Sequence, residues 1–331
     1  MNHRERIHAA LRGQPVDQVP VALWRHFPND DLRAETLAAR VVEFQKKHDF
    51  DFVKVTPASG YPAEMYGATF VDGKNREGTR SYTKRPVIAL EDWDKITPLD
   101  ATNPVFVRET SALKKIRQQL GPDVHILQTI FGPLNSAHNL GGERTFADLR
   151  AHPDVLERAL RAITETTIRF AVASLRSGAD AIFFATQMAT PKYLTPEEFR
   201  QFSEPYDLQV IEAMRAMSHD FILLHVHGLD VYFDMLARWP VDVVNWHDRR
   251  TAPSLTEARE ILRLTQNDSA LAGGLDEWNT LAAGSPEDVK TQAREAVAQT
   301  EGRGFILAAG CVIPVDTPDA NIRAAVEAVG A

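Results

Sequence analysis

Three side chains of metal-ligand type stand at the ends of two apolar segments. Residues 221–228 read Phe-Ile-Leu-Leu-His-Val-His-Gly and place His225 and His227 two positions apart. Residues 304–318 read Gly-Phe-Ile-Leu-Ala-Ala-Gly-Cys-Val-Ile-Pro-Val-Asp-Thr-Pro and carry Cys311, the only cysteine of the chain. Imidazole and thiolate are the ligands that Zn²⁺ prefers. The two segments therefore indicate an enzyme with one shared metal site, if the fold brings them together.

The spacing of the two histidines favours this interpretation. In a regular strand, residues two apart face the same side, so His225 and His227 would both point toward the same cavity. The alternatives stay open at this point, because a His-x-His pair arises by chance in many chains. A lone cysteine such as Cys311 is most often a buried apolar filler.

Composition limits the class of protein. The chain has 331 residues, of which 44% are hydrophobic and 25% charged, enough for one large α/β barrel or two average domains. A net charge of −8 gives no general attraction to nucleic acid or anionic lipid. One cysteine excludes an internal disulfide, and neither a signal peptide nor an apolar run of roughly 18 residues is present. We expect a cytoplasmic protein with a small-molecule substrate.

Apolar and amphipathic segments alternate about eight times. The predicted strands are 19–24, 52–56, 125–130, 179–185, 221–226, 241–246, 270–275 and 305–309. The predicted helices between them include 154–177, 196–217, 255–264 and 286–300. Continuous apolar strands separated by helices are typical of a parallel sheet covered on both faces, and eight units predict a single-domain (β/α)₈ TIM barrel over 1–331. An open doubly wound sheet is the alternative, but no G-x-G-x-x-G follows the first strand.

One segment departs from this alternation. Residues 57–122 carry Tyr-Pro, Asp-Gly-Lys and other turn signals without regular periodicity. We expect this segment to be an insertion after the second strand, with a hairpin before a helix near 111–120.

Several short motifs occur in a fixed order along nearly the whole chain. They are Arg-Glu-Arg at 4–6, Val-Pro-Val at 19–21, Phe-Gly-Pro-Leu at 131–134, Leu-Thr-Pro-Glu-Glu-Phe at 194–199, His-Val-His-Gly at 225–228, Gly-Gly-Leu-Asp at 273–276 and Gly-Cys-Val-Ile-Pro-Val-Asp-Thr-Pro at 310–318. In this order and spacing the chain resembles the uroporphyrinogen decarboxylase superfamily. That superfamily consists of (β/α)₈ barrels and includes porphyrinogen decarboxylases and zinc-dependent methyltransferases of corrinoid pathways.

The chain departs from the pattern of true porphyrinogen decarboxylases. These carry an arginine-rich loop after the first strand, where this chain has Arg25 and then acids. They also carry an essential aspartate after the second strand, where this chain has no carboxylate until Glu64. Their histidine in the last strand is replaced by Cys311. We therefore expect uroporphyrinogen, which has eight carboxylates, to be a poor substrate.

The resemblance to the methyltransferase branch implies a zinc site. That branch has a His-x-Cys motif in the middle of the chain and a cysteine in a G-C-x-I-P segment near its end. This chain keeps His225 and Cys311 and has His227 in place of the first cysteine. Zn²⁺ accepts two nitrogens and one sulfur and would keep a fourth position open. The exchange of thiolate for imidazole makes the site less negative and leaves other metals possible.

Further polar residues follow the predicted strands. His247 follows the sixth strand and could be a ligand, a general base or a loop histidine. Asp276 follows the seventh and is either catalytic or the N-cap of the next turn. Arg25 and His26 follow the first and could contact an anionic substrate or be solvent-exposed. The candidates for cofactor binding are Tyr206, Gln128 and Gln187, with Glu64 as a further polar residue.

Three function classes remain. In metal-assisted methyl transfer, a metal would bind a soft nucleophile such as a thiol and present it to a methylated corrinoid on a partner protein. In a decarboxylase or related lyase acting on a tetrapyrrole or a smaller acid, Arg25 or Arg249 would bind a carboxylate and a histidine would supply a proton. The third class is a barrel that binds a small ligand without catalysis. Metal content would separate the first class from the others.

Overall fold

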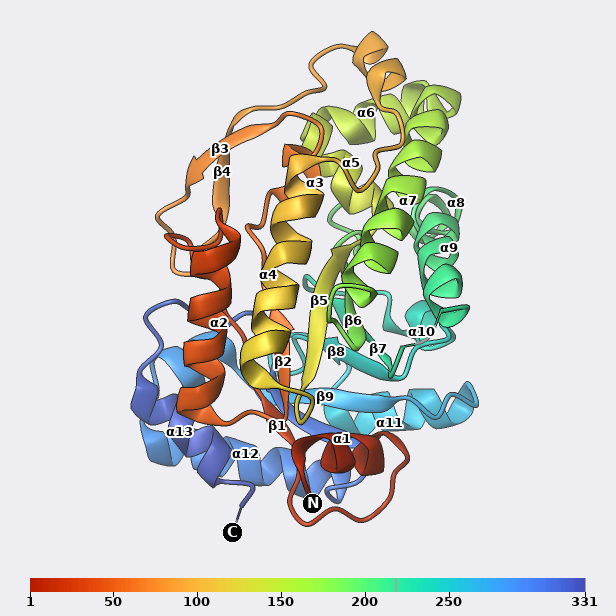
Figure 1. Cartoon of the computed structure of the whole chain (residues 1–331). Helices are drawn as coiled ribbons and strands as arrows, with labels where there is room; N and C mark the ends of the chain where they lie inside the picture. The colour runs from red at the N-terminus through yellow and green to blue at the C-terminus, as the bar shows by residue number, and fades with distance from the viewer. Residues whose placement is uncertain (218, 331) are drawn as a thin grey trace.

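A barrel of eight parallel strands forms the centre of the molecule (Figure 1). The computed structural model describes residues 1–217 and 219–330. The barrel strands are β1 (Val21–Ala22), β2 (Phe52–Val55), β5 (His125–Phe131), β6 (Ala181–Thr186), β7 (Ile222–Val226), β8 (Val243–Trp246), β9 (Ala270–Leu275) and β10 (Phe305–Ala309). They pair in the order β1-β10-β9-β8-β7-β6-β5-β2. The predicted (β/α)₈ barrel is confirmed.

Helices cover the outside of the barrel, and α1 lies across the end where the strands begin (Figure 1). They are α1 (His3–Leu11), α2 (Ala34–His48), α3 (Tyr61–Glu64), α4 (Pro104–Leu120), α5 (Pro133–Gly141), α6 (Arg144–Ala151), α7 (Pro153–Leu175), α8 (Pro196–Phe202), α9 (Glu204–Arg215), α10 (Phe233–Leu236), α11 (Leu255–Leu264), α12 (Pro286–Thr300) and α13 (Asp319–Glu327), with a 3₁₀ turn at Leu90–Lys95 and a π-helix at Glu277–Ala282. Because helices cover one face of each strand and the barrel interior covers the other, the strand residues are buried almost without exception. This explains their continuous apolar runs. No helix in the described ranges is long and apolar enough to cross a membrane.

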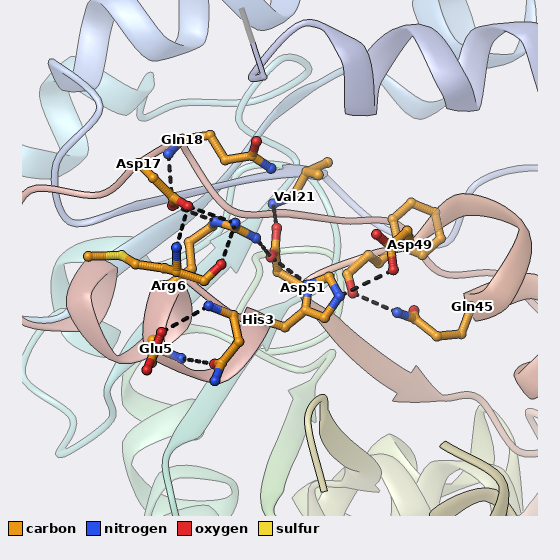
Figure 2. A network of polar contacts seen from close by, with 12 residues as sticks. His3, Glu5, Arg6, Asp17, Gln18, Val21, Gln45, Asp49 and Asp51 are labelled. Carbon is orange, nitrogen blue, oxygen red and sulfur yellow. Dashed lines mark hydrogen bonds and ion pairs between the residues drawn. The ribbon is translucent and has the colours of Figure 1, made fainter. Parts of the chain in front are cut away.

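A carboxylate joins the two strands at which the sheet does not pair. Asp51, directly before β2, accepts a hydrogen bond from Val21 N at 2.8 Å, and its own N donates to Val21 O at 2.9 Å (Figure 2). Arg6 of α1 donates to the other oxygen of Asp51 at 2.5 Å, and Asp17 pairs with the same guanidinium. His3 Nδ1 lies 3.0 Å from Asp51 Oδ1. The N-terminal helix is therefore anchored to the seam between β1 and β2.

The predicted insertion after the second strand forms a small separate sheet. In it, β3 (Thr69–Asp72) pairs antiparallel with β4 (Arg80–Lys84). This hairpin lies at the end of the molecule away from both chain termini, which is the end where the barrel strands finish (Figure 1). Its position depends on a buried ion pair between Arg80 and Asp31. Because Arg80 is almost completely buried there, the pair holds the hairpin over the mouth of the barrel.

Three predicted elements differ most from the structure in their bounds. The helix expected over 196–217 breaks at Ser203 into α8 and α9, because Pro205 has no N–H to continue the first helix and begins the second. The first strand pairs over only two residues instead of 19–24, since Pro20 cannot donate to a neighbouring strand. The helix expected near 111–120 begins at Pro104, where Asn103 caps it through a hydrogen bond from Val105 N.

Candidate metal centre

The three predicted metal ligands converge at the carboxyl ends of two strands. His225 lies within β7, His227 follows it directly, and Cys311 stands two residues beyond β10. Cys311 Sγ lies 3.5 Å from His225 Nε2 and 3.5 Å from His227 Nδ1. The three ligand atoms all lie within 4.8 Å of one another. A tetrahedral Zn²⁺ site separates nitrogen and sulfur ligands by roughly 3.5 Å, so this donor set fits zinc.

A neighbouring amide fixes the orientation of the first histidine. Asn245 of β8 donates through Nδ2 to Ala272 O at 2.9 Å and Ala309 O at 3.1 Å. Its Oδ1 must therefore accept, and it lies 2.6 Å from His225 Nδ1. The proton of His225 is thereby assigned to Nδ1, and the lone pair of Nε2 faces Cys311.

The protonation states of the cluster also suit a metal. Burial lowers the pKa of His225, which keeps the imidazole neutral. Burial by itself would raise the pKa of the Cys311 thiol, but His225 and His227 beside it hold that pKa well below its usual range. A neutral imidazole and a thiolate are the forms that bind metal.

His247 reaches the same cluster from β8. Its Nε2 lies 3.3 Å from His227 Nδ1, and its Nδ1 lies 2.8 Å from a carboxylate oxygen of Glu277. Burial lowers the pKa of His247, but hydrogen bonds to Cys311 and Glu277 outweigh it and raise that pKa to about 10. Arg250 donates to the same Glu277 oxygen at 3.0 Å. Sequence analysis did not single out Glu277, which lies in the turn after Asp276.

The cluster forms one wall of a cavity of about 270 Å³. Two further predicted residues, His26 and Gln187, line this cavity. Lys54 and Glu77 also line it and were missed. Lys54 could have been noticed in the sequence, because it is a charged residue within the apolar run that forms β2. Glu77 could not have been recognised in this way, because it lies in the loop between β3 and β4 and only the tertiary fold brings it to the cavity.

Three residues predicted to be catalytic lie outside the lining of this cavity, namely His247, which contacts His227 from behind the lining, and Arg25 and Asp276. Arg25 Nη1 donates to Val315 O at 3.0 Å and its guanidinium stacks on neighbouring rings, in a separate surface hollow. Asp276 caps the π-helix, since its Oδ1 accepts from Trp278 N and Asn279 N, both at 2.8 Å. Sequence analysis left two roles open for Asp276, catalysis and helix capping, and its contacts are those of a helix N-cap.

Three other polar candidates also lie apart from the cluster. Gln128 is fully buried within β5, where its Nε2 lies 3.4 Å from Thr129 O. Tyr206 is buried on α9 on the outside of the barrel. Glu64 forms a two-pronged ion pair with Arg108 at 2.8 and 2.7 Å. The structure does not bring these side chains into the cavity.

A second group with ligand-type atoms stands at the opposite end of the barrel. His125 Nε2 lies 3.2 Å from His8 Nε2 and 3.1 Å from Asp220 Oδ2. Arg4 pairs with the same Asp220 carboxylate at 3.2 Å. We interpret this group as an ion-pair network that anchors α1, because a guanidinium already neutralises the carboxylate.

Comparison with known proteins adds relatives of full length. The chain is 25% identical to methylcobamide:CoM methyltransferase MtbA of Methanosarcina mazei, with 98% of this chain and 96% of the relative covered. It is 27% identical to methylcobamide:CoM methyltransferase MtaA of Methanosarcina barkeri, with the same coverage. It is 26% identical to the chloroplastic uroporphyrinogen decarboxylase 2 of Arabidopsis thaliana, with 95% of this chain and 82% of the relative covered.

A solved structure of a methyltransferase from Methanosarcina mazei superimposes with a TM-score of 0.82 at 25% identity, over 99% of this chain and 98% of the other. The sequence matches the family described as uroporphyrinogen decarboxylase (URO-D) over residues 2–331. The expected superfamily is confirmed: this chain belongs to the uroporphyrinogen decarboxylase family.

Proposed function

We propose that the protein is a zinc-dependent methyltransferase that transfers a methyl group between a corrinoid and a small thiol. The observation that carries this proposal is that Cys311 Sγ lies 3.5 Å from both His225 Nε2 and His227 Nδ1, with the ligand atoms of all three residues within 4.8 Å of one another. Two full-length relatives named as methylcobamide:CoM methyltransferases support it. A bound zinc ion would supply Lewis acidity, which lowers the pKa of a thiol in its open position and makes it a nucleophile at neutral pH.

The residues of the chain have separate tasks in this proposal. Asn245 holds His225 in the tautomer that a ligand needs, and His225 and Cys311 provide a neutral nitrogen and a thiolate. His247, held by Glu277, keeps a proton-exchanging group beside the cluster. His225, His227 and Cys311 would hold the zinc ion that binds the thiol as a thiolate, with the thiol proton released to solvent. A methylated corrinoid would supply the methyl group to the sulfur and would keep the electron pair of its broken bond.

The size of the cavity favours a small substrate. Ligand pockets commonly enclose about 300–1,000 Å³, and this cavity of about 270 Å³ is slightly smaller than that range. Decarboxylation of a small organic acid is the second candidate function. It is favoured by Lys54, a cationic side chain that lines the cavity. Release of CO₂ from small acids by the purified protein would identify that activity.

Metal analysis of protein purified without a histidine tag tests the proposal. We expect about one zinc per chain in the wild-type protein and a large loss in the Cys311→Ser and His227→Ala variants. His152→Ala is the matched control, because this histidine is exposed and lies outside the cluster. Transfer from methylcobalamin to small thiols, followed by the change in cobalamin absorbance, should be lost in the same two variants. Full metal content in both variants would contradict the proposal.

A further inference from the structure

A lysine faces the interior of the barrel without a carboxylate partner. Lys54 lies in the middle of β2, where Phe52 and Lys54 face the barrel interior and Val53 and Val55 face the helices. It is 8% exposed. In the described part of the chain, its one hydrogen bond is from Nζ to Thr56 Oγ1 at 3.3 Å. No carboxylate offsets the effect of burial on the Lys54 pKa, and the one charge that does so is that of Cys311. Burying a lysine is costly unless its charge is paired, so this position calls for an explanation.

One other unused donor lies in the same part of the cavity. Thr56 is 2% exposed, lines the cavity and accepts the hydrogen bond from Lys54, which leaves its hydroxyl proton free for another partner. His26 lines the cavity beside it. Burial lowers the pKa of His26 to about 3, so its ring is neutral and carries one N–H, which its hydrogen bond with the backbone of Pro57 occupies.

One aromatic ring connects these groups with the metal centre. Lys54 Nζ lies 4.5 Å from the centre of the Phe183 ring, and the ring of His225 lies 5.4 Å from the same ring. Trp24 packs on Phe183 at 5.3 Å. The ammonium and the metal ligand thus approach the same apolar surface, and a molecule of a few atoms in length could touch both.

We propose that Lys54 and Thr56 form an anion subsite that binds the carboxylate of a small organic acid, whose other end reaches His225, His227 and Cys311. The proposal deepens the proposed function, on which it rests for the thiol end of the substrate. The substrate class is then a short mercapto acid. The Lys54 ammonium and the Thr56 hydroxyl would donate to the carboxylate oxygens, and the carboxylate would neutralise the buried lysine.

Calorimetric binding measurements on zinc-loaded protein test this subsite with three probes. The probes are 3-mercaptopropionate, the uncharged 3-mercapto-1-propanol, and succinate, which has carboxylates and no thiol. In wild type we expect the mercapto acid to bind more tightly than the mercapto alcohol. In Lys54→Met the affinity for the mercapto acid and for succinate should fall at least about tenfold, with that for the alcohol unchanged. Lys192→Met is the matched control, since this exposed lysine also lies over an aromatic ring, at 4.8 Å, but outside the cavity lining.

The outcomes separate this subsite from the proposed function. Equal binding of the acid and the alcohol, unaffected by Lys54→Met, would overturn the subsite and leave the metal-dependent function standing. If neither thiol binds but succinate binding depends on Lys54, the subsite stands and the thiol-directed function fails. Equal losses in Lys54→Met and Lys192→Met would also overturn the subsite, because the effect would then be one of general charge. A thermal melt of each variant confirms that it is folded before binding is measured.

Discussion

Asn245 Oδ1 lies 2.6 Å from His225 Nδ1, and this contact determines which nitrogen of His225 faces Cys311. The amide cannot rotate, because both hydrogens of its Nδ2 are bound to the carbonyls of Ala272 and Ala309 on neighbouring strands. The barrel itself therefore sets the tautomer of a candidate metal ligand. In metal sites such partners of the ligands contribute strongly to affinity.

Removal of the Asn245 side-chain amide should weaken zinc binding by more than the accompanying loss of folding stability accounts for. For Asn245→Ala we expect zinc affinity to fall about 10- to 100-fold, because His225 loses the group that orients it. Asn267→Ala is the matched control: Asn267 Nδ2 likewise serves two carbonyls, those of Ala237 and Trp239, but no histidine. Both variants should lose about 1–3 kcal/mol in urea unfolding. Competition with a chromogenic chelator measures the affinity, and equal affinities in the two variants would contradict the prediction.

In the ligand-free protein, the buried Lys54 ammonium should lower the free energy of unfolding relative to the Lys54→Met variant. Burial lowers the pKa of Lys54 from 10.5 to about 7. Below about pH 7, Lys54 is charged in the folded state and the full cost of burying that charge lowers the free energy of unfolding. Between the folded-state and the unfolded-state pKa, the folded protein has lost this proton while the unfolded chain still holds it. The free energy of unfolding therefore rises with pH over this range. Wild-type stability relative to Lys54→Met should therefore increase by about 2 kcal/mol between about pH 7 and about pH 9.

Urea unfolding of both proteins across this pH range checks the expectation. At neutral pH the Lys54→Met variant should be more stable by a few kcal/mol, in line with the cost of a lone buried charge. Lys192→Met, at the surface, should show no such pH-dependent difference from wild type. A constant stability difference between wild type and Lys54→Met at all pH values would show that the ammonium is not desolvated.

The carboxylate at the barrel seam should matter for stability and not for the metal. Asp51 is 1% exposed and binds both Val21 N and Arg6. Asp51→Ala should cost about 3 kcal/mol, because it leaves buried donors without a partner. Asp17→Ala, which removes a half-exposed partner of the same arginine, should cost about 1 kcal/mol or less. Zinc content should stay near that of wild type in both variants, because Asp51 and the metal centre lie at opposite ends of the barrel. Loss of zinc from a folded Asp51→Ala variant would contradict this prediction.

Uroporphyrinogen should not be turned over at a significant rate. The cavity of about 270 Å³ is small for a tetrapyrrole, and the Arg25 side chain in the loop after β1 lines a different hollow. The two cations that line the cavity are Lys54 and Arg80, and Arg80 is already paired with Asp31, so the lining cannot neutralise eight carboxylates. Chromatography of the porphyrins formed after incubation measures the activity. Stepwise loss of carboxylates by the purified protein would show this expectation to be wrong.

Much of the fold could be predicted from the order of residues alone. Strands that are buried on both faces must be apolar throughout, so runs such as 270–275 and 305–309 revealed β9 and β10 with their actual bounds. Parallel strands finish at the same end of a barrel, so ligand-type side chains after β7 and β10 were expected to meet there. The meeting of His225, His227 and Cys311 follows from those two facts.

Tertiary structure alone decided what surrounds these ligands. Lys54 and Glu77 reach the cavity because β2 turns one face inward and because the Arg80–Asp31 ion pair holds the hairpin in place. Asp276 could be assigned to a helix cap only once the turn after β9 was seen. Strand periodicity reports which face is buried, but it does not report which loops fold over the barrel mouth. Contacts between residues far apart in the chain, such as that of Asn245 with His225, leave no local pattern in the sequence.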